Sequence, residues 1–256
     1  MTIWGIIIGG TTGFALGGPI GALIGAAAGH VAERGLQQVI APEQTRNVAF
    51  TVAVIALSAK MARADGVVTR AEINAFRSRV DIPEKDIPQV ARFWDLARQT
   101  PDGFQSYAKQ TVSLFGERAP ILEQLLELLF FIARADSHIA PSEWAYLQEV
   151  ASIFGYDEAQ FEHLAEIYAH DDALPHQILG LAKEADKQTI RTRWKELVRD
   201  HHPDQLIAKG MPAEFIDAAT DRLARINRAY ELMMKQAPDA PLSSHATRLK
   251  WPRLLF

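Results

Sequence analysis

His202, Pro203 and Asp204 are adjacent near the C-terminal end of the chain, and their side chains suit a rigid turn. Proline prevents a helix from extending through it, and His and Asp can bond to nearby backbone groups. No further ligands stand at metal-binding spacing from His201 and His202, and no Ser/His/Asp set or phosphate-cradling loop is evident. The pattern therefore favours recognition of a partner, and we expect neither enzymatic activity nor a cofactor.

A stripe of basic residues precedes this turn on a helix that we predict over residues 187–200. Arg191, Lys195 and Arg199 are four residues apart, which places them on one face of that helix. A solvated helix face is the commoner explanation of such a stripe when it stands alone. Beside the His-Pro-Asp turn, we interpret the stripe as part of one partner-binding surface that includes the turn.

Apolar residues predict how two helices position the turn. The predicted helix over residues 187–200 and a second one over residues 213–235 each carry apolar residues at steps of three and four. These residues are Ile190, Trp194, Leu197 and Val198 in the first helix, and Ile216, Ala219, Leu223, Ile226, Tyr230 and Met233 in the second. Two such helices can pair as an antiparallel hairpin with the turn exposed at its tip.

Together these features resemble the J-domain of DnaJ-type co-chaperones over residues 174–236. The resemblance rests on the His-Pro-Asp turn between the helices, the Leu179-Gly180 turn before them and the Ile-Asn-x-Ala-Tyr-Glu segment from Ile226. It implies that the basic helix meets an acidic surface of a DnaK-type ATPase, and that the turn contacts the junction between ATPase and linker. The resemblance thus implies an activator of a partner's ATPase.

Some residues depart from the J-domain pattern. Trp194 stands where tyrosine is usual, and Glu196 and Asp200 stand where basic residues are common. Arg199 is placed on the basic face by spacing alone. A degenerate J-like domain that activates no partner is therefore one alternative.

Residues 44–170 are predicted to form an all-helical domain with an internal repeat. The segment 62–72 matches the segment 133–143, and each lies between two helical patterns. Thr69 and Glu72 have the spacing of a capping box at the start of a helix. We therefore expect a duplicated helix-turn-helix unit.

The repeat also places carboxylates in equivalent positions, namely Asp65, Glu72, Asp136 and Glu143. Related by pseudo-symmetry, they could approach one another and hold a divalent cation. The pattern lacks the oxygen positions of an EF-hand loop, and helix capping is the commoner use of such residues. A metal site here is therefore the minority interpretation.

The same stretch resembles the TerB-like domain, which is named after a tellurite-resistance protein. The resemblance rests on the Ala-x-Ala-Asp-Gly turn and its second copy, where Ser137 replaces the usual glycine. It implies an interaction module more than an enzyme. An alternative function is therefore a metal-binding or stress-response scaffold built on this domain, with the J-domain as an accessory.

An uncharged apolar segment opens the chain, and we predict a membrane anchor over residues 1–32. Residues 3–28 are long enough to span a bilayer, which requires about 20 helical residues. Glycine recurs every fourth residue, so two such helices could pair closely through that face. The predicted dimer face comprises Gly5, Gly9, Gly13, Gly17, Gly21 and Gly25. Because Pro19 can kink a helix, a membrane hairpin and a glycine-rich tail are alternatives to a single spanning helix.

Composition limits the remaining possibilities. The formal net charge of −4 argues against nucleic-acid binding by bulk electrostatics. The absence of cysteine excludes disulfides and thiolate metal sites, and it fits a reducing compartment.

The order of the parts, ending with a tail over residues 237–256, resembles the DjlA-like family of membrane-anchored DnaJ-type co-chaperones. The resemblance implies an all-α, single-pass protein of the bacterial inner membrane with its helical domains in the cytoplasm. It also implies a DnaK-type partner and a homodimer formed through the membrane helix.

Overall fold

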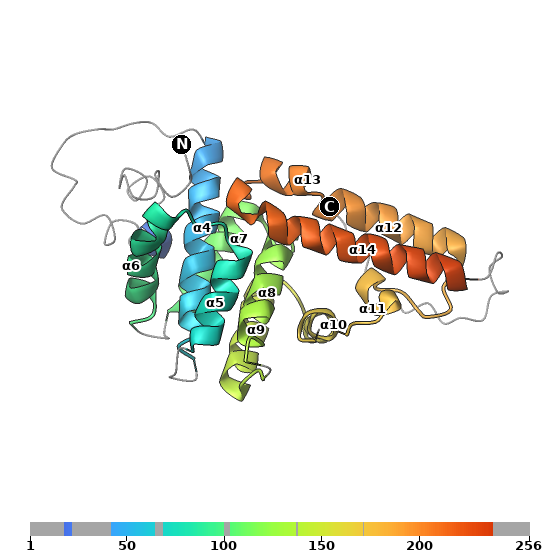
Figure 1. Cartoon of the computed structure of the whole chain (residues 1–256), viewed down its shortest axis with the longest axis horizontal. Coiled ribbons are helices and arrows are strands. Elements are labelled where there is room, and N and C mark those ends of the chain that lie inside the picture. The colour runs from blue at the N-terminus through green and yellow to red at the C-terminus, as the bar shows by residue number, and fades with distance from the viewer. Residues whose placement is uncertain are drawn as a thin grey trace.

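The computed structural model describes residues 18–21, 42–64, 69–99, 103–136, 138–170 and 172–237. Every regular element in these ranges is a helix, which confirms the predicted all-α class. The helical body comprises α4 (Pro42–Met61), α5 (Arg70–Arg79), η2 (Glu84–Asp86), α6 (Ile87–Ala97), α7 (Phe104–Phe115), α8 (Pro120–Ala133), α9 (Pro141–Ile153) and α10 (Glu158–Tyr168). The C-terminal hairpin comprises α11 (Pro175–Leu179), α12 (Lys187–His201), α13 (Pro203–Ala208), η3 (Ala213–Phe215) and α14 (Ile216–Gln236). Figure 1 shows the hairpin extending away from the body, with its α13 end against the body.

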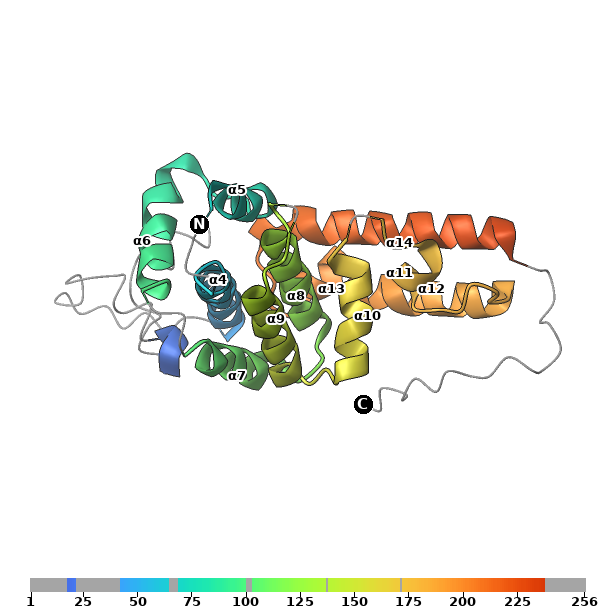
Figure 2. The ribbon, with the colours of Figure 1, turned by 90° about the horizontal axis from the view of Figure 1, so that it is seen from below.

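The central helix of the body is α4, which Figure 2 shows surrounded by other helices of the body. Its side chains from Val48 onward are buried on all sides, because α6, α7 and α8 pack around it. A helix that is apolar on nearly all sides suits such a position, and its buried polar residues are Thr51, Ser58 and Lys60. Thr51 is compatible with it because its hydroxyl donates to the backbone oxygen of Asn47 at 2.9 Å. The body thus has one continuous core.

The predicted repeat corresponds to two helix-turn-helix units, α4–α5 and α8–α9. In the first unit the Thr69 hydroxyl accepts from the Glu72 backbone N–H at 3.2 Å, and the Glu72 carboxylate accepts from the Thr69 backbone N–H at 2.7 Å. In the second unit Glu143 accepts from the backbone N–H of Ala140 at 2.8 Å, just before α9. Each unit therefore starts its second helix with a carboxylate bonded to the backbone three residues earlier.

Only residues 18–21 of the predicted membrane anchor are described. They are helical, and the backbone N–H of the fully buried Ile20 donates to the side-chain oxygen of Gln110 on α7 at 2.9 Å. Gly21 is buried, whereas the other glycines of the predicted dimer face, Gly5, Gly9, Gly13, Gly17 and Gly25, lie outside the described residues. Within the part of the chain that the structure describes, no helix is both long and apolar enough to cross a bilayer.

The hairpin has a small apolar core between α11, α12 and α14. Its buried residues are Leu179, Ile190, Leu197, Ile226, Ala229 and Met233. The ring of Trp194 stacks on Tyr230 with centroids 4.5 Å apart, and its indole N–H donates to the Asn227 side-chain oxygen at 2.8 Å. The predicted pairing of two striped helices is therefore confirmed.

Candidate functional site

The His-Pro-Asp turn forms the junction between α12 and α13. The Nδ1 atom of His202 accepts a hydrogen bond from the Asp204 backbone N–H at 3.2 Å, so His202 caps α13. Pro203 opens α13, where a missing N–H leaves no hydrogen bond unmade. The side chain of His202 is 43% exposed and that of Asp204 is 83% exposed. The turn is therefore held by local bonds and remains accessible at its outer face.

The predicted basic stripe is exposed along α12. Arg191, Lys195 and Arg199 are all solvent-accessible, and a further step of three residues continues the stripe to His202.

Glu196 and Asp200, the acidic residues that depart from the J-domain pattern, contact arginines of the same helix. Arg199 donates to Asp200 at 2.9 Å, and Arg193 donates to Glu196 at 3.2 Å. The Arg193 pair offsets the charge of Glu196, whereas the Asp200 pair engages Arg199, a cation of the stripe itself.

Three of the four carboxylates considered for a metal site are described, and each bonds to a backbone N–H of its own segment. Glu72 and Glu143 bond to the backbone before their own helices, and Asp136 accepts from the backbone N–H of His138 at 3.1 Å. Asp65 lies outside the described residues. Among the residues described, no group of three or more His, Asp or Glu side chains could hold a metal ion. The observed contacts are those of caps and turns.

A buried charged cluster lies behind the turn, where the hairpin meets the body. His201, the last residue of α12, is 3% exposed, and its Nε2 atom lies 3.4 Å from Arg222 Nη2 and 3.8 Å from Glu123 Oε2. Arg222 on α14 pairs directly with Glu123 on α8, and it donates to Glu127 at 3.1 Å. The hydroxyl of Tyr168 donates to Glu123 at 3.0 Å. This junction cluster therefore links α8 and α10 to both long helices of the hairpin.

Burial and pairing fix the charges in the junction cluster. Burial lowers the pKa of His201 to about 3, and the Arg222 charge acts in the same direction, so the ring is neutral near pH 7. Burial alone would raise the pKa of Glu123, but the charge and hydrogen bond of Arg222 outweigh it and lower that pKa to about 2. Burial alone would lower the pKa of Arg222, but the charge of the facing Glu123 outweighs burial and raises that pKa. Arg222 and Glu123 thus form a charged pair beside a neutral imidazole.

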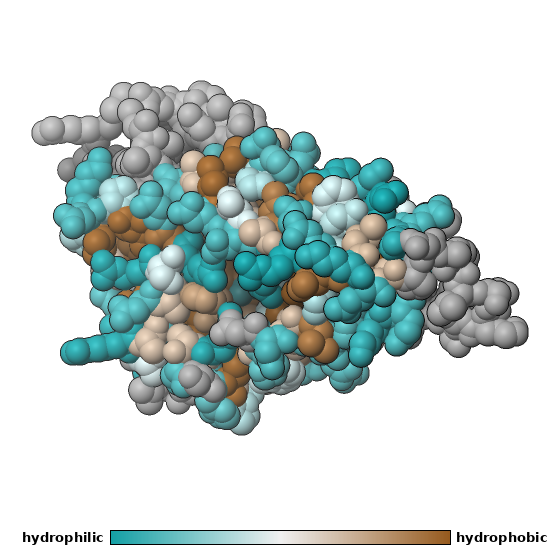
Figure 3. Space-filling model, turned by 45° about the vertical axis from the view of Figure 1, so that its right-hand side comes forward, coloured by the Kyte–Doolittle hydropathy of each residue, from teal (hydrophilic) through white to brown (hydrophobic). Residues whose placement is uncertain are grey.

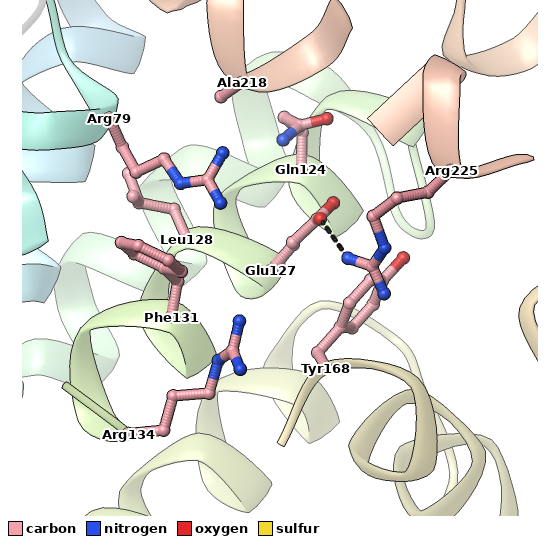
Figure 4. A pocket seen from close by; sticks show the side chains of 9 residues that line it. All are labelled: Arg79, Gln124, Glu127, Leu128, Phe131, Arg134, Tyr168, Ala218 and Arg225. Atoms are coloured by element: carbon pink, nitrogen blue, oxygen red, sulfur yellow. Dashed lines mark hydrogen bonds and ion pairs between the residues drawn. The ribbon is translucent and has the colours of Figure 1, made fainter. Parts of the chain in front are cut away.

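Figure 4 shows the neighbouring pocket, which both parts of the molecule line. The side chains of Arg79, Arg134 and Arg225 point toward the space beside Glu127. Arg225 donates to Glu127 at 3.2 Å, and the guanidinium of Arg79 lies 4.1 Å from the ring centroid of Phe131. The contact between body and hairpin is therefore rich in arginine around a central carboxylate.

The periodicity of α14 contains a signal for the junction cluster that the sequence analysis missed. The buried residues of this helix are Ala219, Arg222, Ile226, Ala229 and Met233, at steps of three and four. The prediction assigned Leu223 to this stripe, but Leu223 is only partly buried and Arg222 is 5% exposed. An arginine at a core spacing indicates a buried partner of opposite charge.

Comparison with protein families identifies three regions in the chain. Residues 51–166 match the family described as tellurite resistance protein TerB, and residues 174–238 match the DnaJ domain. Residues 1–39 match the co-chaperone DjlA transmembrane domain, which supports a membrane anchor at this end. These are the parts expected, in the expected order.

Similarity to characterised proteins extends over most of the chain. The co-chaperone protein DjlA of Photobacterium profundum is 27% identical, and the alignment covers 91% of this chain and 99% of that protein. DjlA of Escherichia coli K12 is 23% identical over 92% of this chain and 98% of its own length. DjlA of Legionella pneumophila is 25% identical over 91% and 95%, respectively. No solved structure matches the chain.

Proposed function

We propose that this chain, which is DjlA-like in the order of its parts and over most of its length, recruits a DnaK-type chaperone to the bacterial inner membrane. There it stimulates the chaperone's ATPase. The observation that carries the proposal is the exposed His-Pro-Asp turn at the end of the exposed basic stripe on α12.

The two parts of this surface have different roles in docking. Arg191, Lys195 and Arg199 are exposed cations, so they would speed encounter with an acidic surface and orient it. His202 and Asp204 form a small rigid contact, since the bond between Nδ1 and the backbone fixes their relative position. The stripe would therefore guide the partner, and the turn would provide the specific contact.

Stimulation follows if the turn binds one conformation of the partner better than another. A ligand shifts a conformational equilibrium only by its difference in affinity for the two states. In this proposal the surface binds more tightly to the partner conformation that hydrolyses ATP. The protein itself then needs no catalytic group, in keeping with a regulatory role.

The distribution of exposed apolar residues suits recruitment of a chaperone better than direct binding of unfolded chains by this protein. Among the described residues, the large apolar side chains with substantial exposure are Ile73, Trp144, Leu174 and Leu232, which come from separate elements. The face in Figure 3 is largely hydrophilic, with apolar residues in small patches. An extended apolar groove for a client is thus not evident on this face.

The membrane part of the proposal rests on the N-terminal region. Its match to the DjlA transmembrane domain supports an anchor, and the glycine spacing favours pairing of two anchors as a homodimer. A DnaK-type partner and its ATP occupy the cytoplasm, so the body and hairpin would face that side.

The test is the steady-state ATP turnover of a DnaK-type chaperone with the full chain in detergent micelles. The wild-type chain should raise turnover, and His202→Gln should abolish the increase. Arg228→Gln, at an exposed position on α14, serves as the matched control and should stimulate like wild type. Unchanged turnover with the wild-type chain, or full stimulation by His202→Gln, would contradict the proposal.

A further inference from the structure

We propose that Glu123 and Arg222 are positioning residues, which hold the His-Pro-Asp turn in its docking orientation from the side of the helical body. This inference rests on the docking function proposed above. It makes the body, and not the hairpin alone, responsible for the geometry of the docking surface.

The first argument is the position of His201 immediately before the turn. Its ring is buried against Arg222 and Glu123, at 3.4 and 3.8 Å respectively. Successive residues at a helix end point about 100° apart, because a turn contains 3.6 residues. Holding the His201 ring inward therefore directs His202 outward, where its side chain is 43% exposed.

The second argument is that the chain after the turn is also fixed to the body. Leu206 of α13 and Met211 are fully buried, and both belong to the continuous core of the body. The ring of Phe215 packs against Phe50 of α4 with centroids 5.2 Å apart. Figure 1 shows α13 and the start of α14 against the body. The turn is thus held on both sides, by the junction cluster before it and by apolar packing after it.

The third argument concerns what a buried ion pair contributes. Such a pair adds little stability compared with apolar residues of similar volume, because both charges lose their hydration. It does impose a defined geometry, since each carboxylate must meet its cation. Arg222 meets Glu123 and Glu127 at once, while Tyr168 donates to Glu123. These directional bonds set the angle at which α12 and α14 meet α8.

Another ion pair between body and hairpin, outside the junction cluster, provides the matched control. Arg79 on α5 and Asp221 on α14 pair at 2.6 Å, with side chains 29% and 66% exposed. This pair crosses the same interface but contacts neither His201 nor the turn in any bond described. Arg79→Gln therefore removes a body–hairpin contact without removing the positioning bonds.

The experiment uses the full chain in detergent micelles and the variants Arg222→Met, Arg222→Lys, Glu123→Gln and Arg79→Gln. Two quantities are measured: the concentration giving half-maximal stimulation of the DnaK-type ATPase, and hydrogen exchange of a peptide containing the Asp204 amide. If only about a tenth of the molecules keep the docking orientation, apparent affinity falls about tenfold. We therefore expect Arg222→Met and Glu123→Gln to raise the half-maximal concentration about tenfold with an unchanged plateau.

Amide exchange should rise in the same two variants, while Arg222→Lys should restore part of both quantities and Arg79→Gln should match wild type. Glu123→Gln is nearly isosteric and decides the question if Arg222→Met does not fold. Wild-type values for folded Glu123→Gln, or an equal change in Arg79→Gln, would overturn the inference. Failure of the wild-type chain to stimulate would instead refute the docking function, and the exchange measurement would still test the positioning.

Discussion

Phe215 of the hairpin packs edge-on against Phe50 of the body, with ring centroids 5.2 Å apart and planes at 81°. Phe50 lies on α4, the central helix of the body, and Phe215 follows the segment that carries the His-Pro-Asp turn. Both rings are almost completely buried. The hairpin end that bears the proposed docking residues therefore shares the core of the body.

Removing the Phe215 ring should destabilise the body and the hairpin together. Phe215→Ala loses a buried ring and leaves a cavity beside Phe50, which costs about 3–5 kcal/mol in comparable cores. Urea unfolding followed by circular dichroism measures the loss. Leu232→Ala, at a position that is 39% exposed, is the control and should change the unfolding free energy by less than about 0.5 kcal/mol. A loss of that small size for Phe215→Ala would mean that the two parts are independent.

Gly210 is required where the chain turns from α13 toward α14. Its φ is +108°, and a Cβ atom there would lie 2.8 Å from Arg46 Cβ and 3.2 Å from the Phe115 ring. Gly210→Ala therefore combines backbone strain with a clash against the body, and we expect a loss of about 2–4 kcal/mol. Gly116→Ala is the matched control, because Gly116 has φ +87° and an added Cβ would meet nothing within 4 Å. Equal losses of unfolding free energy in the two variants would contradict the close packing at Gly210.

Acidification should weaken the fold through His201. Its pKa falls from 6.5 to about 3 on folding, mainly because of burial, so the unfolded chain binds a proton that the folded chain rejects. The contribution of this group to the unfolding free energy is fully present above pH 6.5. It is lost as pH falls from 6.5 toward 3, by up to about 1.4 kcal/mol per pH unit. The charged groups that act on the ring are Arg222, Glu123, Asp200 and Arg193.

Urea unfolding between pH 6.5 and 4.5 measures this effect above 4.5, the ordinary pKa of Glu123. Burial also lowers the pKa of His163 from 6.5, so the contribution of His201 is the difference between wild type and a His201 variant. His201→Gln cannot take up the proton, so its unfolding free energy should depend less steeply on pH in this window. Parallel pH profiles for wild type and His201→Gln would refute the assignment.

The hairpin could be predicted because its determinants are local. Leu197 and Ile226 follow helical periodicity, and both are buried where the pattern places them. The basic stripe could be predicted from residue spacing alone, and the turn could be predicted from its proline. The segment between α12 and α14 was predicted only in part, because α13 forms from residues that were expected only to connect the two helices.

The spacing of α14 indicates that Arg222 is buried, but its partners in the junction cluster could not be predicted, because their contacts join residues far apart in sequence. Arg222 and Glu123 are 99 positions apart, and no local pattern identifies Glu123 as the partner of Arg222. Leu206 and Phe215 carry no periodic signal for the body's core, although both are buried in it. Such contacts depend on how the hairpin docks, which local patterns do not encode.

Charge reversal on the basic stripe should slow docking more than it weakens the final contact. Arg191→Glu replaces an exposed cation, so the association rate with a DnaK-type partner should fall about tenfold at low salt, and the difference from wild type should shrink at high salt. Stopped-flow binding across a salt series measures the association rate and the dissociation rate. Arg228→Glu makes the same charge change on α14 and should have a much smaller effect. Equal slowing by the two variants would show that net charge matters and that the stripe does not.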